Sequence, residues 1–192
     1  EGTNEINRML IVDMMLRKAL KGHVDLLGPA RKVAAELMEI PDFGADEPTG
    51  FLAPETKILM QLKKANLLVA GAAVQHYGTA LVDEQEALMR LADMAMEVYV
   101  LESDLLKTQR LSARLSDQEN EIRGILGTLQ AHHAAEKCLS AGREVIMGLP
   151  ENDEQRMMLM GLRRFTKTPS VNLKNLRRKV AQYVLEKGKY PF

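Results

Sequence analysis

The chain has 192 residues, of which 46% are hydrophobic and only 4% aromatic, with 12 methionines and no tryptophan. An apolar content made mostly of leucine, alanine, valine and methionine suits helix packing more than strand pairing, so composition predicts an all-α protein. The 26 basic and 26 acidic residues cancel, which argues against a nucleic-acid-binding chain, and the lone cysteine, Cys138, excludes an internal disulfide. The sequence also has no apolar run of the roughly 18 residues that a transmembrane helix needs, and no start typical of a signal peptide.

The first ten residues, EGTNEINRML, contain the arrangement that most resembles a catalytic site. Thr3 is a candidate N-cap and Glu5 falls in the first turn, so Glu1 would stand on a bend just before a helix. A carboxylate held there can act as a base. Gly2 lets a bound group approach the backbone closely, and the first-turn amides favour a phosphate or a polarised carbonyl. The alternative is an ordinary helix cap, which is the commoner meaning of Glu-Gly-Thr before a helix.

Residues 1–11, EGTNEINRMLI, resemble the catalytic-glutamate motif near the end of the acyl-CoA dehydrogenases. An aromatic residue usually precedes the glutamate in that family, and this position falls before Glu1. The resemblance implies the C-terminal part of a longer flavoenzyme, most similar to long-chain and very-long-chain members with an extra helical domain after the catalytic core. Beyond the first 53 residues the resemblance lies in length and helicity, without a motif.

The resemblance assigns a role to each of the first five residues. Glu1 would remove the α-proton of a fatty acyl-CoA thioester while the β-hydrogen leaves as hydride to N5 of FAD. Its backbone N–H and a flavin ribityl hydroxyl would polarise the thioester carbonyl. Gly2 would contact substrate, and Thr3, Asn4 and Glu5 would touch FAD. Because most flavin and acyl contacts would lie upstream, we expect the 192-residue chain alone to bind no stoichiometric FAD and to be inactive.

The same resemblance implies the partners and the compartment. Electrons would pass to an electron-transfer flavoprotein, and the protein would form a homo-oligomer. We expect a cytoplasmic location if the source is bacterial and a mitochondrial one if it is eukaryotic, with possible peripheral contact to a membrane.

Apolar spacing and end signals predict a series of helices in chain order. The predicted ranges are 4–21, 29–40, 54–77, 83–115, 117–147, a short helix from Pro150 to before Pro169, and a last helix from a Ser170 cap to about Glu186. These give an all-α antiparallel helical bundle at 54–192, preceded by a linker at 41–53. Residues 1–40 would be the last helices of the acyl-CoA dehydrogenase C-terminal bundle.

Several helices carry finer expectations. The wide apolar stripe of 4–21 predicts burial of much of that helix. The apolar stripe of the 83–115 helix becomes irregular after Leu105, because Thr108 and Ser112 occupy the inward positions. We therefore expect the C-terminal end of this helix to be exposed or to meet a partner. Ser116-Asp117-Gln118-Glu119 matches a capping box. The glycines at 71, 124 and 127 indicate close helix contact or, for the last two, local looseness.

The C-terminal region is strongly basic, with nine Lys or Arg and one acid in residues 163–192. Lys174, Arg177, Arg178 and Lys179 on the last helix fit a membrane-surface element, or else a solvated face that balances the acidic middle of the chain. The second hypothesis for function is that residues 54–192, which resemble in length and helicity the additional C-terminal domain of the very-long-chain enzymes, form a non-catalytic helical module for dimerisation or membrane docking.

His132, Glu136 and Cys138 stand near one another in sequence, and the first two have a spacing used in metal sites. Since no second ligand group accompanies them, we interpret them as ordinary core and surface residues. Cys138 has no neighbouring base in the sequence, so we do not expect it to be a nucleophile.

Overall fold

The computed structural model describes residues 3–37 and 48–192, and these residues form helices without β-strands. The elements are α1 (Asn4–Leu20), α2 (Leu27–Glu36), α3 (Ala53–Tyr77), the 3-10 helix η1 (Gly78–Asp83), α4 (Gln85–Ser112), α5 (Asp117–Met147), α6 (Asp153–Phe165) and α7 (Leu173–Lys187). The prediction of an all-α chain is confirmed. None of the helices in the described ranges combines the length and apolar character needed to cross a membrane.

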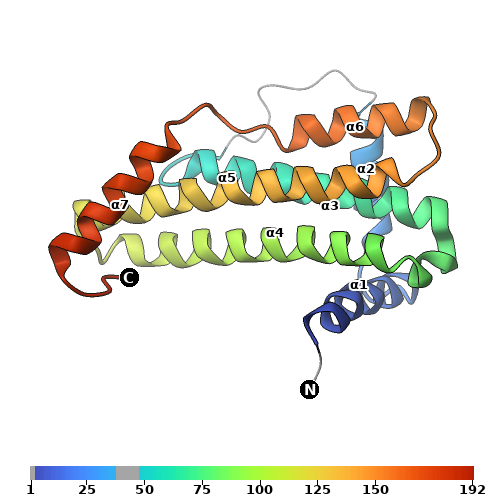
Figure 1. Ribbon diagram of the computed structural model, residues 1–192, viewed down its shortest axis with the longest axis horizontal. Coiled ribbons are helices and arrows are strands. Elements are labelled where there is room, and N and C mark those ends of the chain that lie inside the picture. The colour runs from blue at the N-terminus through green and yellow to red at the C-terminus, as the bar shows by residue number, and fades with distance from the viewer. Residues whose placement is uncertain (1–2, 38–47) are drawn as a thin grey trace.

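Three long helices, α3, α4 and α5, form the centre of the molecule (Figure 1). Each packs against the other two, and α4 runs antiparallel to both α3 and α5. The other helices lie on this centre: α1 against α4, α2 against α3, α6 against both α3 and α5, and α7 against α5. The predicted antiparallel bundle is therefore present, and α1 and α2 pack directly on it.

Local sequence signals explain where the long helices begin and end. Pro54 stands in the first turn of α3, where its missing N–H costs nothing, and Gly78 ends α3 at a φ of 54°. The predicted capping box opens α5: the Glu119 N–H donates to Ser116 Oγ at 3.3 Å, and the Ser116 N–H donates to the Glu119 carboxylate at 3.0 Å. Hydrogen bonds from the Ser116 side chain and backbone lower the pKa of Glu119. The predicted capping box is confirmed.

The structure corrects several helix starts. The α6 helix begins at Asp153 rather than Pro150, and α7 begins at Leu173 rather than after Ser170. In each case an asparagine is the cap, because its side-chain oxygen accepts a backbone N–H three residues on: Asn152 from Gln155 at 2.8 Å, and Asn172 from Asn175 at 3.1 Å.

Earlier in the chain, α4 starts at Gln85 because η1 takes up Gly78–Asp83, and α2 starts at Leu27 rather than Pro29. The predicted end of that second helix and most of the predicted 41–53 linker fall in 38–47, outside the described residues.

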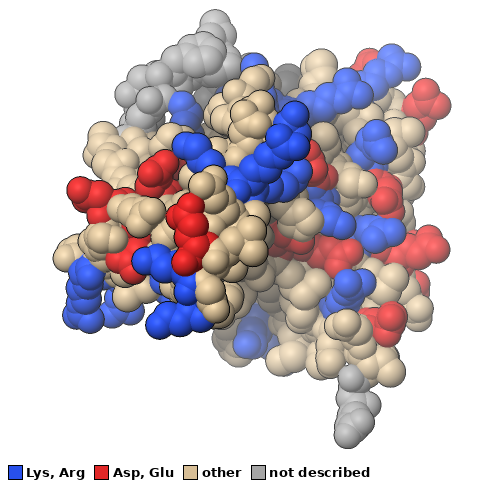
Figure 2. Space-filling model, turned by 60° about the vertical axis from the view of Figure 1, so that its left-hand side comes forward, with Lys and Arg blue, Asp and Glu red and all other residues tan. Residues whose placement is uncertain are grey.

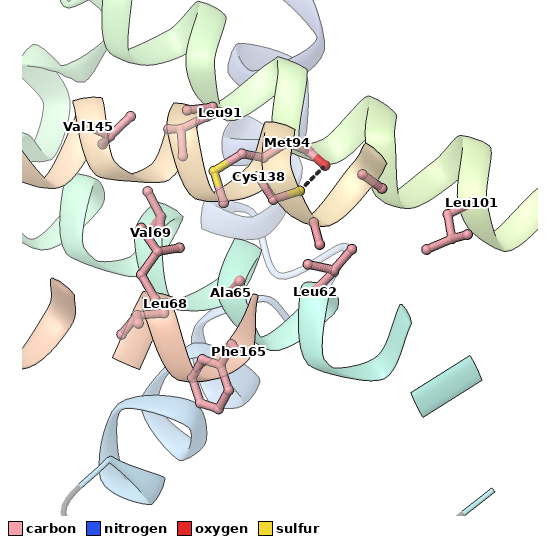
Figure 3. Close-up of a cluster of buried hydrophobic side chains, with 14 of the residues drawn as sticks. Leu62, Ala65, Leu68, Val69, Leu91, Met94, Leu101, Cys138, Val145 and Phe165 are labelled. Carbon is pink, nitrogen blue, oxygen red and sulfur yellow. Dashed lines mark hydrogen bonds between the residues drawn. The ribbon is translucent and has the colours of Figure 1, made fainter. Parts of the chain in front are cut away.

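The main core runs through α1 to α6. Leu62, Leu101 and Phe165 are almost fully buried in it (Figure 3), and α1 and α2 add Val12 and Val33. A separate small cluster of Ile122, Ile125 and Tyr183 holds α7 on α5. The helices before the predicted linker thus share a core with those after it, whereas α7 is held by contacts of its own.

The glycines and the end of α4 show how closely the helices approach. A Cβ on Gly71 would lie 3.2 Å from Ala30 of α2, and one on Gly127 would lie 3.3 Å from Leu105 of α4, so both mark close helix contacts. The expectation of an exposed or partner-bound end of α4 is wrong for Thr108, which is only 3% exposed, whereas Ser112 is half-buried and Gln109 and Arg110 are exposed. The start of α5 runs back along α4 beside this end, which the stripe of α4 alone could not show.

Candidate functional site at the start of α1

The described residues of the predicted site lie at the N-terminal end of α1, which packs against one side of α4 (Figure 1). Glu1 and Gly2 fall outside the described residues. Thr3 is extended, with φ −72° and ψ 159°, and holds the N-cap position. Asn4 and Glu5 form the first turn, and all three side chains are exposed. The structure therefore brings Thr3, Asn4 and Glu5 together on an open helix end.

This helix end has unused hydrogen-bonding groups. The Asn7 N–H donates to the Thr3 carbonyl at 3.0 Å and closes the first helical turn, so the amides of residues 4–6 have no partner within the helix. The Thr3 hydroxyl makes no capping hydrogen bond. A hydroxyl and several outward amides at the positive end of the helix dipole suit an oxygen-rich or anionic group.

Most of the surface of α1 is exposed. Val12 is its only buried side chain among those described, which contradicts the expectation that much of this helix is buried. The reason is that α1 packs mainly on α4, so only one side of it is covered. On the uncovered side Ile6, Leu10 and Met14 follow one another at a spacing of four and are 46–55% exposed. An apolar stripe therefore starts directly beside the predicted site.

Arg8 is a residue near this site that sequence reasoning missed. Its guanidinium Nε lies 3.2 Å from a carboxylate oxygen of Asp93 on α4. The sequence holds no local signal for this pair, because the two residues belong to different helices that only the fold brings together.

The other candidates do not form a reactive site. His132 is 7% exposed, whereas Glu136 points to solvent on the same helix. Within the described ranges no group of three or more His, Cys, Asp or Glu is placed to hold a metal. Cys138 is fully buried, with its thiol 3.9 Å from the Met94 carbonyl (Figure 3). Burial, with a smaller contribution from Glu97, raises its pKa to about 12, so the thiol stays protonated and unreactive near neutral pH.

A hollow of about 490 Å³ opens between α2, α3 and α6 and is lined mainly by apolar side chains such as Ala34, Leu68 and Met158. None of Thr3, Asn4 and Glu5 lines it. It is thus separate from the described part of the predicted site.

Comparison with known proteins identifies the family. A family model described as the acyl-CoA dehydrogenase C-terminal domain matches residues 61–164, more than half of the chain. The chain belongs to this acyl-CoA dehydrogenase family. A probable acyl-CoA dehydrogenase of Bacillus subtilis (strain 168) is 35% identical over 191 residues, which are 99% of this chain and 32% of that protein.

A solved structure agrees with this assignment. The acyl-CoA dehydrogenase of Bacillus anthracis, crystallised in complex with FAD, matches with a TM-score of 0.90 and 33% identity over 100% of this chain and 32% of that one. The chain therefore spans about a third of the length of these two acyl-CoA dehydrogenases. The family predicted from residues 1–11 is confirmed, and the family match falls within the predicted 54–192 unit.

Proposed function

We propose that this chain is the C-terminal part of an FAD-dependent dehydrogenase that introduces the α,β double bond into fatty acyl-CoA thioesters, as in fatty acid β-oxidation. The observation that carries this proposal is the motif EGTNEINRMLI at an open, uncapped helix start in a member of the acyl-CoA dehydrogenase family. The whole chain, rather than the motif alone, matches a protein described as a probable acyl-CoA dehydrogenase.

Glu1 is the proposed base. A solvated carboxylate with a pKa of about 4.3 is too weak to take the α-proton of a thioester, so the base must work where water is excluded and where donors stabilise the enolate. In the sequence Glu1 precedes the N-cap Thr3 by two residues, and the outward first-turn amides of α1 would favour the negative charge that develops on the enolate. Gly2, which has no side chain, would let the thioester approach the backbone closely.

The residues of α1 fit one side of an FAD site. When bound, FAD would accept the β-hydrogen as hydride. The Thr3 hydroxyl, which makes no capping hydrogen bond, and the first-turn amides, which have no partner within the helix, are donors for carbonyl or phosphate oxygens, and the exposed Asn4 and Glu5 side chains add polar contacts. These few exposed groups make one wall of such a site, so the 192-residue chain alone is expected to bind no stoichiometric FAD.

The proposal extends to partners. Acyl-CoA would be the substrate, an electron-transfer flavoprotein would take up the electrons, and the enzyme would be a homo-oligomer. A cytoplasmic site in bacteria, or a mitochondrial one in eukaryotes, agrees with the reduced state expected of Cys138.

The test replaces Glu1 by glutamine in the polypeptide with its natural flanking sequence. Dehydrogenation of an acyl-CoA is expected to fall by about 10²–10⁴-fold, the usual contribution of a general base, while bound flavin is retained. Glu86→Gln is the matched control, because it removes an exposed carboxylate on α4 outside the predicted site. Equal activity of Glu1→Gln and the unaltered enzyme would exclude Glu1 as the base.

A second function is favoured by the exposure of α7. Lys174, Arg177, Arg178 and Lys179 are all exposed, and only Lys179 makes an ion pair, with Glu121 at 3.4 Å, within the described part of the chain. Figure 2 turns the α7 end forward and shows Lys and Arg interspersed with Asp and Glu there. Because the four basic side chains of α7 are exposed, we propose that this helix associates with a membrane surface. The mixed charge limits how strongly the face can attract anionic lipid, so this association is an accessory property.

Sedimentation with phosphatidylglycerol vesicles tests this accessory property. Neutralising Arg177, Arg178 and Lys179 to glutamine is expected to reduce the bound fraction severalfold. The control neutralises three exposed basic residues elsewhere, Lys18, Lys21 and Arg31. The same loss in both variants would mean that total charge, rather than α7, binds the vesicles.

A further inference from the structure

A chain of charged side chains connects α1 to the bundle. Arg8, in the second turn of α1, places its Nε 3.2 Å from Oδ1 of Asp93 on α4. This N–H is buried and lacks the angle of a hydrogen bond, so the contact is an ion pair. The other Asp93 oxygen lies 3.4 Å from Nη1 of Arg90, and Nε of Arg90 donates to Glu144 of α5 at 2.6 Å. Charges on three helices are thus linked in series.

These side chains surround a small polar hollow of about 240 Å³ between α4 and α5 beneath α1, which Glu97 and Lys137 also line. The hydrogen bond to Glu144 is the main cause of the raised pKa of Arg90. On the bundle side, the Asp93 carboxylate therefore pairs with Arg90. Its other oxygen pairs with the guanidinium of Arg8 on α1.

The apolar contacts of α1 are few. Val12 is buried, and Met9 and Leu16 pack partly buried against the core. Arg8, Val12 and Leu16 follow at a spacing of four, so the ion pair lies on the same side of the helix as this packing. Apolar contact is non-directional, whereas the attraction between Arg8 and Asp93 weakens as their charged groups move apart and so favours alignments of α1 that keep them close.

We infer that Arg8 and Asp93 are positioning residues, which fix the rotation and the axial register of α1 on α4 and thereby place Thr3 to Glu5 one turn upstream. The pair is partly exposed, 33% for Arg8 and 24% for Asp93, so it contributes little to overall stability. Its effect is on where α1 lies. The consequence for catalysis rests on the proposed function, whereas the consequence for α1 does not.

The chain offers a matched control. Arg17 lies on the same helix and pairs with Asp13 of α1 itself at 2.9 Å, so Arg17→Gln removes an arginine and an ion pair without loosening α1 from the bundle. Arg8→Lys keeps a positive charge near Asp93 and is the conservative variant.

The first experiment measures backbone amide hydrogen exchange in the 192-residue chain. Arg8→Gln is expected to raise exchange in α1 by about two- to fivefold, the range that a partly exposed ion pair allows, while α3, α4 and α5 stay protected, and Arg8→Lys should restore most of the protection. Arg17→Gln should leave the rest of α1 close to the unaltered chain. Equal exchange of α1 in Arg8→Gln and Arg17→Gln would overturn the inference.

The second experiment uses the enzyme with its natural flanking sequence. Arg8→Gln is expected to lower kcat by about 10- to 100-fold with KM and flavin content nearly unchanged, because a displacement of about 1 Å is enough for such a loss, and Arg8→Lys should recover activity. Unchanged kcat would overturn the catalytic part. If the unaltered enzyme itself lacks dehydrogenase activity while α1 responds to Arg8→Gln, the proposed function fails and the positioning of α1 stands.

Discussion

Cys138 illustrates how the environment of one residue sets its chemistry. The side chain is fully buried among α3, α4 and α5, next to the Met94 carbonyl. The sequence predicted an unreactive thiol from the lack of neighbouring base residues, but only the fold supplies the physical cause, which is the exclusion of water from the thiolate.

Stability should depend on this thiol at high pH. The folded-state pKa of Cys138 is raised from an ordinary value of 9.0 to about 12. The unfolded thiol therefore loses its proton first, so this contribution is fully present below pH 9 and is lost as the pH rises toward 12. Urea unfolding at pH 8 and pH 10.5 should show a larger loss for the unaltered chain than for Cys138→Ala. Parallel losses in the two proteins would contradict the raised pKa.

The α5 helix shows what a sequence pattern can and cannot reveal about an element. Its start and end at Asp117–Met147 follow from a local capping box and from Gly148 and Pro150, all readable in sequence. The structural roles of its glycines cannot be read from the sequence in the same way. Gly127 and Gly142 face other helices at short range, whereas Gly124 meets only the edge of Phe51. The difference depends on which helices lie opposite, and sequence spacing does not contain that information.

Two substitutions in α5 should have opposite effects. A Cβ at Gly124 would lie 3.5 Å from Phe51, an ordinary contact, so Gly124→Ala should stabilise by about 1 kcal/mol through helix propensity. A Cβ at Gly142 would lie 2.9 Å from Leu162 and 3.1 Å from Val69, both fully buried. Overpacking costs about 1–3 kcal/mol and outweighs the same gain, so Gly142→Ala should destabilise.

Urea unfolding of these two variants and the unaltered chain gives the free energies directly. A stabilised Gly142→Ala would mean that Leu162 moves aside without cost. A destabilised Gly124→Ala would mean that the space beside Phe51 is smaller than the 3.5 Å contact indicates.

In the molecule as a whole, the fold class was more predictable than the arrangement of the site. Helical periodicity located the long helices because it is a local property, and residues 1–11 led to the family through resemblance. The burial of Thr108 and the pairing of Arg8 with Asp93 were not predictable, since each depends on a neighbour far away in sequence. The roles of Glu1 and Gly2, and the division at 41–53, stay predictions.

Because α7 is attached separately from the main core, removing its main buried side chain should loosen α7 without loosening the other helices. Tyr183 is 4% exposed and packs with Ile122 and Ile125, so Tyr183→Ala should weaken the docking of α7 by about 3–5 kcal/mol. Because the main core lacks these residues, α3 to α6 should keep their protection. Hydrogen exchange would show this as faster exchange in α7 alone. Leu185→Ala is the control, since Leu185 is 80% exposed on the same helix. Loss of protection throughout the bundle would contradict the independence of α7.

The shared core of α1 to α6 has a consequence for the continuity of the polypeptide. Val12 and Val33 belong to the same cluster as α3 to α6, and Glu36 bonds Lys64 at 2.7 Å and lies 3.5 Å from Arg164 of α6. Non-covalent contacts, rather than the peptide bonds of the intervening sequence, thus hold α1 and α2 in place. A chain divided between α2 and α3 is therefore expected to reassemble from its two fragments by complementation. Lengthening the sequence between them is expected to cost little free energy, because the entropy of closing a loop grows slowly with its length.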